Sequence, residues 1–239
     1  MALFAKNRKR IGCFIIHETN GGCDGDDTLA SYMEKQGYVT YCYTPAMSFD
    51  SWNGVNPNIY IEWLDYAEKK LVEFMKTCYT VVIIGYSIGG LIGIHLAEKY
   101  GVDALITINA PIFISDFRRF VDMLRCELGE KGHSKANRMV ISTLYNLFSF
   151  NKLVNQAKRK LSKLYCPLLV IQSKRDKIFN WSGAYYIFDN VSSRKKEIQF
   201  FPKSGHYILN DSEKQLVFIR VHQFVEKAME SKLLVEGYI

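Results

Sequence analysis

The sequence of 239 residues lacks long apolar runs and repeats. No run approaches the roughly eighteen apolar residues that cross a bilayer, so no integral membrane segment is expected. The basic stretch 6–10 and the apolar stretch 11–16 are too short for a signal peptide and lack a small-residue cleavage site, which favours a first sheet strand at 11–16. Without low-complexity tracts or long linkers, the chain suits one large α/β domain or two small ones.

Cysteine pairs of the C-x-x-C type are also absent. The six cysteines are scattered, and three of them lie in or beside predicted strands: Cys13, Cys23, Cys42, Cys78, Cys126 and Cys166. This distribution predicts buried thiols in the reducing cytoplasm, and neither zinc ligands nor disulfides.

Basic charge is concentrated in one segment. Residues 112–165 hold 11 basic and 4 acidic side chains, while the whole chain has a net charge of +7. We find no nucleic-acid recognition motif beside this charge, so nucleic acid is not expected as a partner. The excess is either a solvated helix surface, as Lys158-Arg159-Lys160 suggests, or a weak attraction for anionic substrates or a lipid surface.

Strand and helix patterns alternate along most of the chain, which predicts an α/β fold with a mostly parallel sheet and helices on both faces. Ligands of such sheets bind at the carboxyl ends of the strands. The strands are expected at residues 11–16, 39–43, 80–84, 104–109, 167–172 and 197–201. The helices are expected at residues 28–36, 60–77, 87–100, 182–190 and 212–231.

The alternation stops between Pro111 and Cys166, where residues 112–165 show helical periodicity without a convincing strand. Breaks are expected at Gly129, Gly132 and Asn151. A helical insertion after a strand's carboxyl end would lie over the active-site face, so we predict a core of residues 1–111 and 166–239 with 112–165 as a lid. Its aromatic residues would either pack the lid onto the core or line an acyl pocket: Phe113, Phe117, Phe120, Tyr145, Phe148 and Phe150.

The run Thr80–Ile84 leads directly into Gly85-Tyr86-Ser87-Ile88-Gly89, a G-x-S-x-G pattern followed by helical spacing. A serine on so sharp a strand-to-helix turn needs glycine neighbours, because Cβ atoms there would collide with the adjoining backbone. The pattern therefore predicts that Ser87 is a nucleophile. The alternative is a glycine-rich turn with an incidental serine.

A serine nucleophile needs a general base, and histidine has the suitable pKa. The candidates are His17, His95, His133, His206 and His222. His206 follows the last strand, where the base of a Ser, Asp, His order falls; the alternative is a solvated loop imidazole.

The base in turn needs a carboxylate that holds its tautomer. Asp176 stands just past a buried strand and thirty residues before His206. Asp176 is preferred over Asp103, which precedes its strand, and over Asp189, which ends a helix on the far side. Asp211 is also less favoured, because it would serve equally well as a helix N-cap. The alternative is a plain turn aspartate.

These motifs together resemble the α/β-hydrolase superfamily, and within it the small carboxylesterase and monoacylglycerol lipase group. The resemblance covers nearly the whole chain through Gly-Tyr-Ser-Ile-Gly-Gly, Asn109-Ala110-Pro111, 172–176 and Ser204-Gly205-His206. It implies an α/β-hydrolase fold and a second oxyanion-hole amide after the first strand. In His17-Glu18-Thr19 that donor is the amide of Thr19, which would act with the amide of Ile88 at the start of the helix.

Glu18 departs from the family, where glycine is usual. Either its side chain points away from the pocket, or its bulk and charge impair oxyanion stabilisation.

The sequence thus predicts a carboxylic ester hydrolase that acts on small-molecule esters through an acyl-enzyme and requires no metal or organic cofactor. Ser87 is the nucleophile, His206 the base and Asp176 the orienting acid. The alternatives are a thioesterase or other acyl transfer, because the same constellation serves several chemistries, and a catalytically weak hydrolase-like binding protein, which Glu18 prompts.

We predict that Glu18→Gly raises activity, because it removes a like charge from the developing oxyanion and lets the loop approach the substrate carbonyl. The charge opposes reaction by ~1 kcal/mol if partly solvated, which corresponds to several-fold in rate. The measurement is kcat/KM with p-nitrophenyl butyrate at low and high salt. A fall in activity would show that Glu18 orders the loop or contacts substrate.

Overall fold

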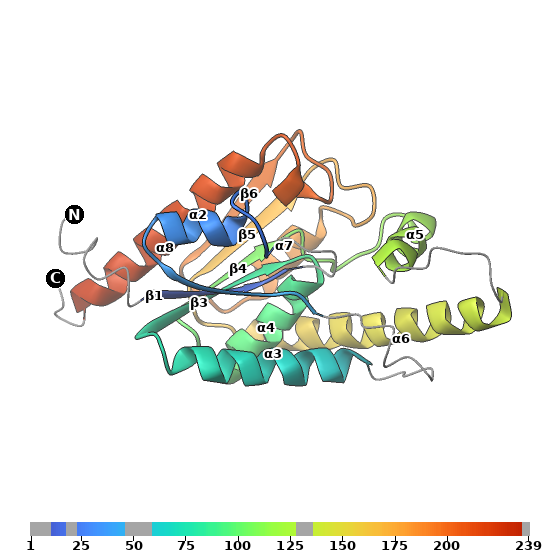
Figure 1. Ribbon diagram of the computed structural model, residues 1–239, viewed down its shortest axis with the longest axis horizontal. Helices are drawn as coiled ribbons and strands as arrows, with labels where there is room; N and C mark the ends of the chain where they lie inside the picture. The colour runs from blue at the N-terminus through green and yellow to red at the C-terminus, as the bar shows by residue number, and fades with distance from the viewer. Residues whose placement is uncertain (1–10, 18–22, 46–58, 128–135, 236–239) are drawn as a thin grey trace.

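One six-stranded parallel sheet organises the chain (Figure 1). The computed structural model describes residues 11–17, 23–45, 59–127 and 136–235. The strand order is β2-β1-β3-β4-β5-β6. The strands are β1 (Ile11–Ile16), β2 (Val39–Tyr43), β3 (Thr80–Tyr86), β4 (Ala104–Ile108), β5 (Leu168–Ser173) and β6 (Lys196–Phe201).

Helices cover both faces of the sheet, as the alternation in the sequence predicted (Figure 1). Five of them are α2 (Leu29–Lys35), α3 (Ile59–Met75), α4 (Ile88–Tyr100), α7 (Gly183–Asn190) and α8 (Lys214–Val235). Every strand lies within two residues of its predicted bounds. The α/β class is therefore confirmed.

Two hydrophobic cores sandwich the sheet, because alternate side chains of each strand point to opposite faces. Phe14 and Ile83 belong to the larger core, under α3 and α4. Cys13 and Val82 belong to the other, under α2 and α8. Every residue of β3 and of β4 is buried, which explains why both strands read as continuous apolar runs in the sequence.

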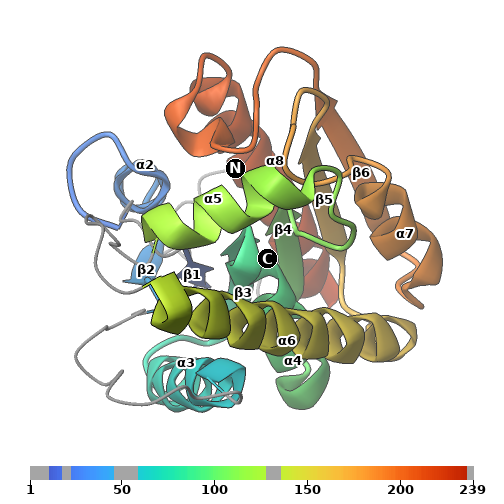
Figure 2. The ribbon, with the colours of Figure 1, turned by 90° about the vertical axis from the view of Figure 1, so that its right-hand side faces the viewer.

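Two helices, α5 (Phe117–Glu127) and α6 (Ala136–Lys160), and a short 3₁₀ turn, η3 (Leu161–Lys163), connect β4 to β5. Figure 2 looks towards the carboxyl ends of the strands and shows α5 and α6 in front of them. The break expected at Asn151 is wrong, because α6 runs through it. Its neighbours Phe150 and Leu153 are buried in the larger core, and this packing outweighs the weak helix propensity of asparagine.

The basic side chains at the end of α6 are only partly solvated, which corrects the expectation for Lys158-Arg159-Lys160. Arg159 is exposed. The Lys158 ammonium lies 4.4 Å from the ring centroid of Phe113, and desolvation lowers the pKa of Lys158. Lys160 forms an ion pair with Glu98 of α4. Two of the three charges therefore hold α6 against its neighbours.

Among the described residues, no helix has both the length and the apolar character required to span a membrane.

The prediction that the cysteines form no disulfide is wrong. Cys23, in the segment after β1, is bonded to Cys42 of β2. The two cysteines are separated by 19 positions in the sequence, and no local pattern indicates their pairing. In the fold, the parallel pairing of β1 with β2 brings the segment after β1 close to Cys42. Cys13, Cys78 and Cys166 are free. The cytoplasmic location was predicted from the expectation of free thiols, and the disulfide removes that support.

We predict that breaking this bond destabilises the fold. Cys23→Ser or Cys42→Ser should lower the free energy of unfolding by about 3 kcal/mol, because the disulfide restricts a loop of this length in the unfolded chain. The measurement is denaturant unfolding with and without dithiothreitol. The reductant should weaken wild type and a Cys166→Ser control, which keeps the disulfide, and should leave the two disulfide variants unchanged. Six free thiols in the unreduced, unfolded wild type would contradict the pairing.

Candidate active site

The turn between β3 and α4 holds Ser87 in a strained conformation. Its φ of 52° lies in a region that residues with a Cβ rarely adopt. The glycines on either side permit the turn: a Cβ on Gly85 would lie 2.3 Å from the carbonyl oxygen of Gly89, and one on Gly89 would lie 2.2 Å from that of Ile16. The helix therefore starts directly against the sheet, as the G-x-S-x-G pattern predicted.

The structure brings together the three residues predicted as a triad. Ser87 Oγ lies 3.0 Å from His206 Nε2, and His206 Nδ1 lies 2.8 Å from Asp176 Oδ2. All three residues are buried, with exposures of 3%, 4% and 7% in that order. Nε2 is thus placed to accept the serine proton while a carboxylate holds the opposite ring nitrogen.

The Asp176 carboxylate is fixed by its own turn. Its Oδ1 accepts hydrogen bonds from the amides of Ile178 and Phe179, both at 2.9 Å, and leaves Oδ2 for His206. These two bonds and the contact with His206 fix the direction of the carboxylate, which suits the task of orienting an imidazole.

The competing carboxylates serve other groups. Asp103 accepts a hydrogen bond from the amide of Val81. Asp211 accepts one from the amide of Gly205 at 3.0 Å, and this bond holds the pKa of Asp211 below its usual value. Its side chain does not cap α8, which begins at Lys214. The N-cap role considered for Asp211 is therefore wrong.

Two residues that the sequence analysis did not single out hold the backbone of His206. Its carbonyl oxygen accepts hydrogen bonds from Asn109 Nδ2 at 2.7 Å and Tyr86 Oη at 2.9 Å. Asn109 follows β4 with a φ of 48°, and Tyr86 stands next to the nucleophile. Both belong to motifs that carried the resemblance, but their contact with a residue about a hundred positions away exists only in the folded chain.

The oxyanion donors are only partly described. Ile88 is the first residue of α4, where helical amides have no partner within the helix. Thr19 and Glu18 lie outside the described residues. The preceding His17 is anchored by its amide, which donates to the carbonyl of Tyr43 at 2.8 Å.

Aromatic rings cover the imidazole on one side. The ring of Phe179 lies 5.0 Å from that of His206, and Phe120 of α5 lies 5.5 Å from Phe179. Phe120 and Phe150 are buried, so these two aromatics of the predicted lid pack onto the core. Phe117 and Phe148 are more than half exposed, Phe113 is half-buried, and the side chain of Tyr145 is not among those described.

Acidic, histidine and cysteine side chains of the described segments form no cluster of three or more that could hold a metal ion.

We predict that Gly85→Ala or Gly89→Ala distorts the turn and destabilises the protein by about 3 kcal/mol, because each new Cβ meets backbone that cannot move aside. The matched control is Gly93→Ala in α4, where the new Cβ meets side-chain methyl groups of Ile83 at 3.1 Å and Leu105 at 3.3 Å and its first backbone neighbour only at 4.0 Å. Thermal unfolding and hydrolysis of p-nitrophenyl butyrate check the effect. Equal behaviour of the three variants would contradict the steric account of the turn.

Comparisons with known proteins find similarity to lipolytic enzymes and esterases. A family model described as "Serine aminopeptidase, S33" matches residues 136–213, which include Asp176 and His206. A thermostable monoacylglycerol lipase of Bacillus sp. (strain H-257) is 24% identical over 229 residues, covering 91% of each chain. A carboxylesterase of Bacillus subtilis (strain 168) is 21% identical over 235 residues, covering 89% of this chain and 91% of the relative.

A solved structure of the metagenome-derived lipolytic enzymes LipS and LipT has a TM-score of 0.65 at 19% identity, covering 92% of this chain and 94% of that one. The resemblance that the motifs indicated is thus confirmed over most of the chain. The chain has the α/β-hydrolase fold and is similar to serine hydrolases named as carboxylesterase and monoacylglycerol lipase.

Proposed function

We propose that this protein is a serine hydrolase that cleaves carboxylic esters of short to medium acyl chains, or monoacylglycerols, through an acyl-enzyme. The alignment of Ser87, His206 and Asp176 at 3.0 and 2.8 Å carries the proposal. The names of the relatives support an ester substrate.

The reaction follows from these contacts. His206 Nε2 takes the proton from Ser87 Oγ, which attacks the ester carbonyl, and the imidazolium then protonates the leaving alcohol. Water repeats the sequence on the acyl-enzyme and releases the acid. The Asp176 carboxylate holds the imidazole in the tautomer that leaves Nε2 free to accept a proton.

The negative charge on the tetrahedral oxygen needs fixed donors. In our proposal these are the amides of Ile88 and Thr19, one at the positive end of α4 and the other in the segment after His17. Each such donor contributes roughly a hundredfold to a thousandfold in turnover.

Substrate must reach a serine that is only 3% exposed. We propose that 112–165 acts as the lid and that α5 moves, because Phe120 of α5 packs against Phe179 beside the imidazole. The outer side of α5 exposes Phe117, Arg118 and Arg119. Arg119 is paired with Asp116, and the exposed ring of Phe117 beside Arg118 supports a weak attraction of this lid to a lipid surface that carries anionic groups.

Thioester hydrolysis or acyl transfer would use the same groups, and a panel of ester chain lengths and thioesters would rank these substrates. A hydrolase-like binding protein would have no need to keep the three residues in hydrogen-bond contact. Reaction with a fluorophosphonate probe separates the two classes, because only an activated serine is phosphonylated.

We predict that Ser87→Ala and His206→Ala each abolish most hydrolysis of p-nitrophenyl butyrate with the fold intact, and that Asp176→Asn lowers kcat by about 10⁴-fold through the wrong tautomer. Wild type should react with the fluorophosphonate probe at Ser87, as mass spectrometry of the labelled peptide checks.

Matched controls are His222→Ala and Asp189→Asn, which change the same residue types away from the site and should keep full activity. Near wild-type turnover by Ser87→Ala or His206→Ala would overturn the proposal. Absence of labelling in the folded wild type would favour the binding protein.

A further inference from the structure

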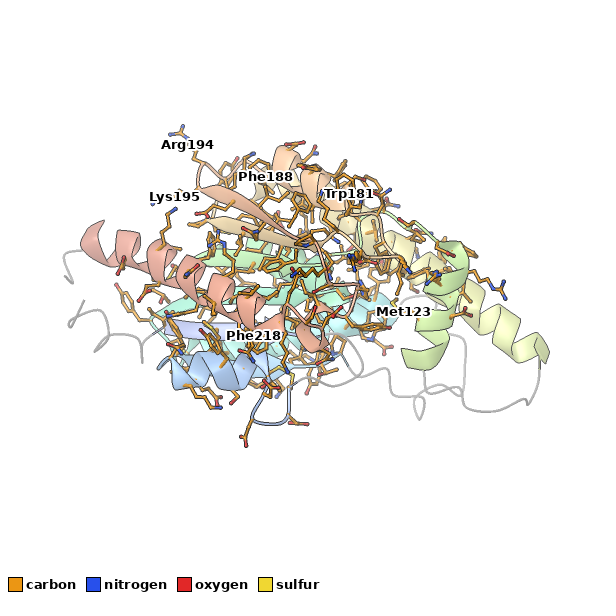
Figure 3. The ribbon with its side chains drawn as sticks, turned by 90° about the horizontal axis from the view of Figure 1, so that it is seen from above. Met123, Trp181, Phe188, Arg194, Lys195 and Phe218 are labelled. Carbon is orange, nitrogen blue, oxygen red and sulfur yellow. A yellow bond between two sulfur atoms is a disulfide. The ribbon has the colours of Figure 1, made fainter. Side chains whose placement is uncertain are left out.

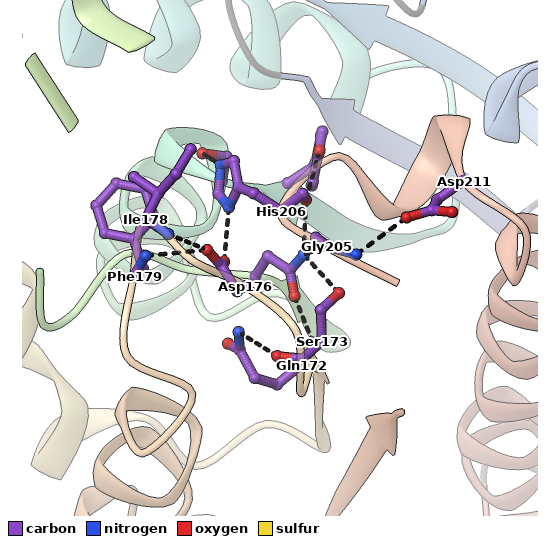
Figure 4. Close-up of polar contacts among 11 residues, drawn as sticks. Gln172, Ser173, Asp176, Ile178, Phe179, Gly205, His206 and Asp211 are labelled. Carbon is purple, nitrogen blue, oxygen red and sulfur yellow. Dashed lines mark hydrogen bonds and ion pairs between the residues drawn. The ribbon is translucent and has the colours of Figure 1, made fainter. Parts of the chain in front are cut away.

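Two carboxylates outside the triad lie at the turn that carries the proposed base. Glu213 is 5% exposed, and the reaction described above gives it no task. Both Glu213 and Asp211 come from the segment between β6 and α8 that follows His206 in the chain. Their oxygens point back to the residues that precede it, as Figure 4 shows for Asp211 and Gly205.

Together they accept hydrogen bonds from three consecutive backbone amides. Glu213 Oε2 accepts from the amides of Lys203 at 2.9 Å and Ser204 at 2.8 Å, and also from Ser204 Oγ at 2.8 Å. Asp211 Oδ2 accepts from the amide of Gly205 at 3.0 Å. These bonds occupy the backbone donors up to the residue before the imidazole.

We propose that Asp211 and Glu213 are positioning residues that set the His206 imidazole on Ser87 by clamping the turn before it. The inference rests on the proposed function.

The backbone around His206 is held from two sides. Asn109 and Tyr86 hold the carbonyl of His206 from one side, and the carboxylates hold the amides before it from the other. Because the backbone is fixed on both sides, the imidazole can move only by rotation about its side-chain bonds. Its two ring nitrogens already have partners at 3.0 and 2.8 Å.

The clamp also ties the base to the acid. The carbonyl of Ser204 accepts a hydrogen bond from the amide of Arg175 at 3.3 Å, next to Asp176. Glu213 holds the amide and hydroxyl of the same Ser204. Release of Glu213 would therefore disturb both turns that meet at the hydrogen bond between Asp176 and His206.

The test compares Glu213→Ala and Asp211→Ala with Glu213→Gln and Asp211→Asn. Each alanine variant should lower kcat for p-nitrophenyl butyrate by about 10- to 100-fold with KM within about twofold, because a small displacement of a catalytic group slows the chemical step more than binding. The amide variants should retain most of the rate, because an amide oxygen still accepts hydrogen bonds. Proton NMR should show loss or displacement of the downfield His206 Nδ1–H resonance in the alanine variants.

Glu197→Gln is the matched control. Glu197 links β6 to α8 through Arg220 and Lys227, away from the His206 turn. Its loss should lower stability without changing kcat, the pH profile of kcat/KM or the imidazole resonance. A merely structural role for the clamp would give the alanine variants this same pattern, and that result would overturn the proposal.

Ser204→Ala gives an independent test if the alanine variants do not fold, because it removes one of the three bonds to Glu213 and keeps the carboxylate. An intermediate fall in kcat with a shifted Nδ1–H resonance supports the clamp, and unchanged values for both contradict it. The resonance needs no turnover. If wild type does not hydrolyse esters but its His206 Nδ1–H resonance still depends on Glu213, the proposed ester hydrolase activity is refuted and the positioning role of Glu213 is retained.

Discussion

The close approach of α4 to the sheet at Ser87 is the constraint on which the site depends. The chain turns from β3 into the helix with so little space that the carbonyl oxygens of Ile16 and Gly89 would meet any added Cβ within about 2.3 Å. This contact places the Ser87 hydroxyl at the carboxyl ends of the strands, with the first helical amides beside it. The neighbouring strands then bring the other groups to the same edge.

The second requirement is that buried polar groups find partners. Ser173, Ser204 and Asn109 are fully buried next to the triad, where an unpaired donor or acceptor costs about 1–3 kcal/mol. Asn109 donates to Ser173 Oγ and to the His206 carbonyl, and accepts from the amide of Ser173. A network satisfied in this way has few alternative arrangements, so it can hold a strained serine and a buried imidazole in register.

The two ends of the sheet differ in what they present. Figure 3 shows Met123 of α5 at the end where the catalytic strands terminate and Arg194 and Lys195 at the other. The inner side of α5 carries apolar side chains towards the site, and its outer side carries arginines. Part of the basic charge further along, at Lys158 and Lys160, is used in contacts within the fold. The net charge of a segment therefore overstates the number of basic side chains that are available to bind a partner.

The sequence by itself determined the alternation of strands and helices, the parallel sheet and the strained turn at Ser87, because these depend on residues within a few positions of one another. Chain order also placed Asp176 and His206 at the ends of adjacent strands. Only the tertiary structure decided that Cys23 bonds Cys42, that Asn151 continues a helix, and that Asp211, Glu213, Tyr86 and Asn109 hold the His206 turn. Those contacts join residues that meet only when the strands pair and the helices pack. A local sequence pattern does not indicate which distant residues will be buried next to one another.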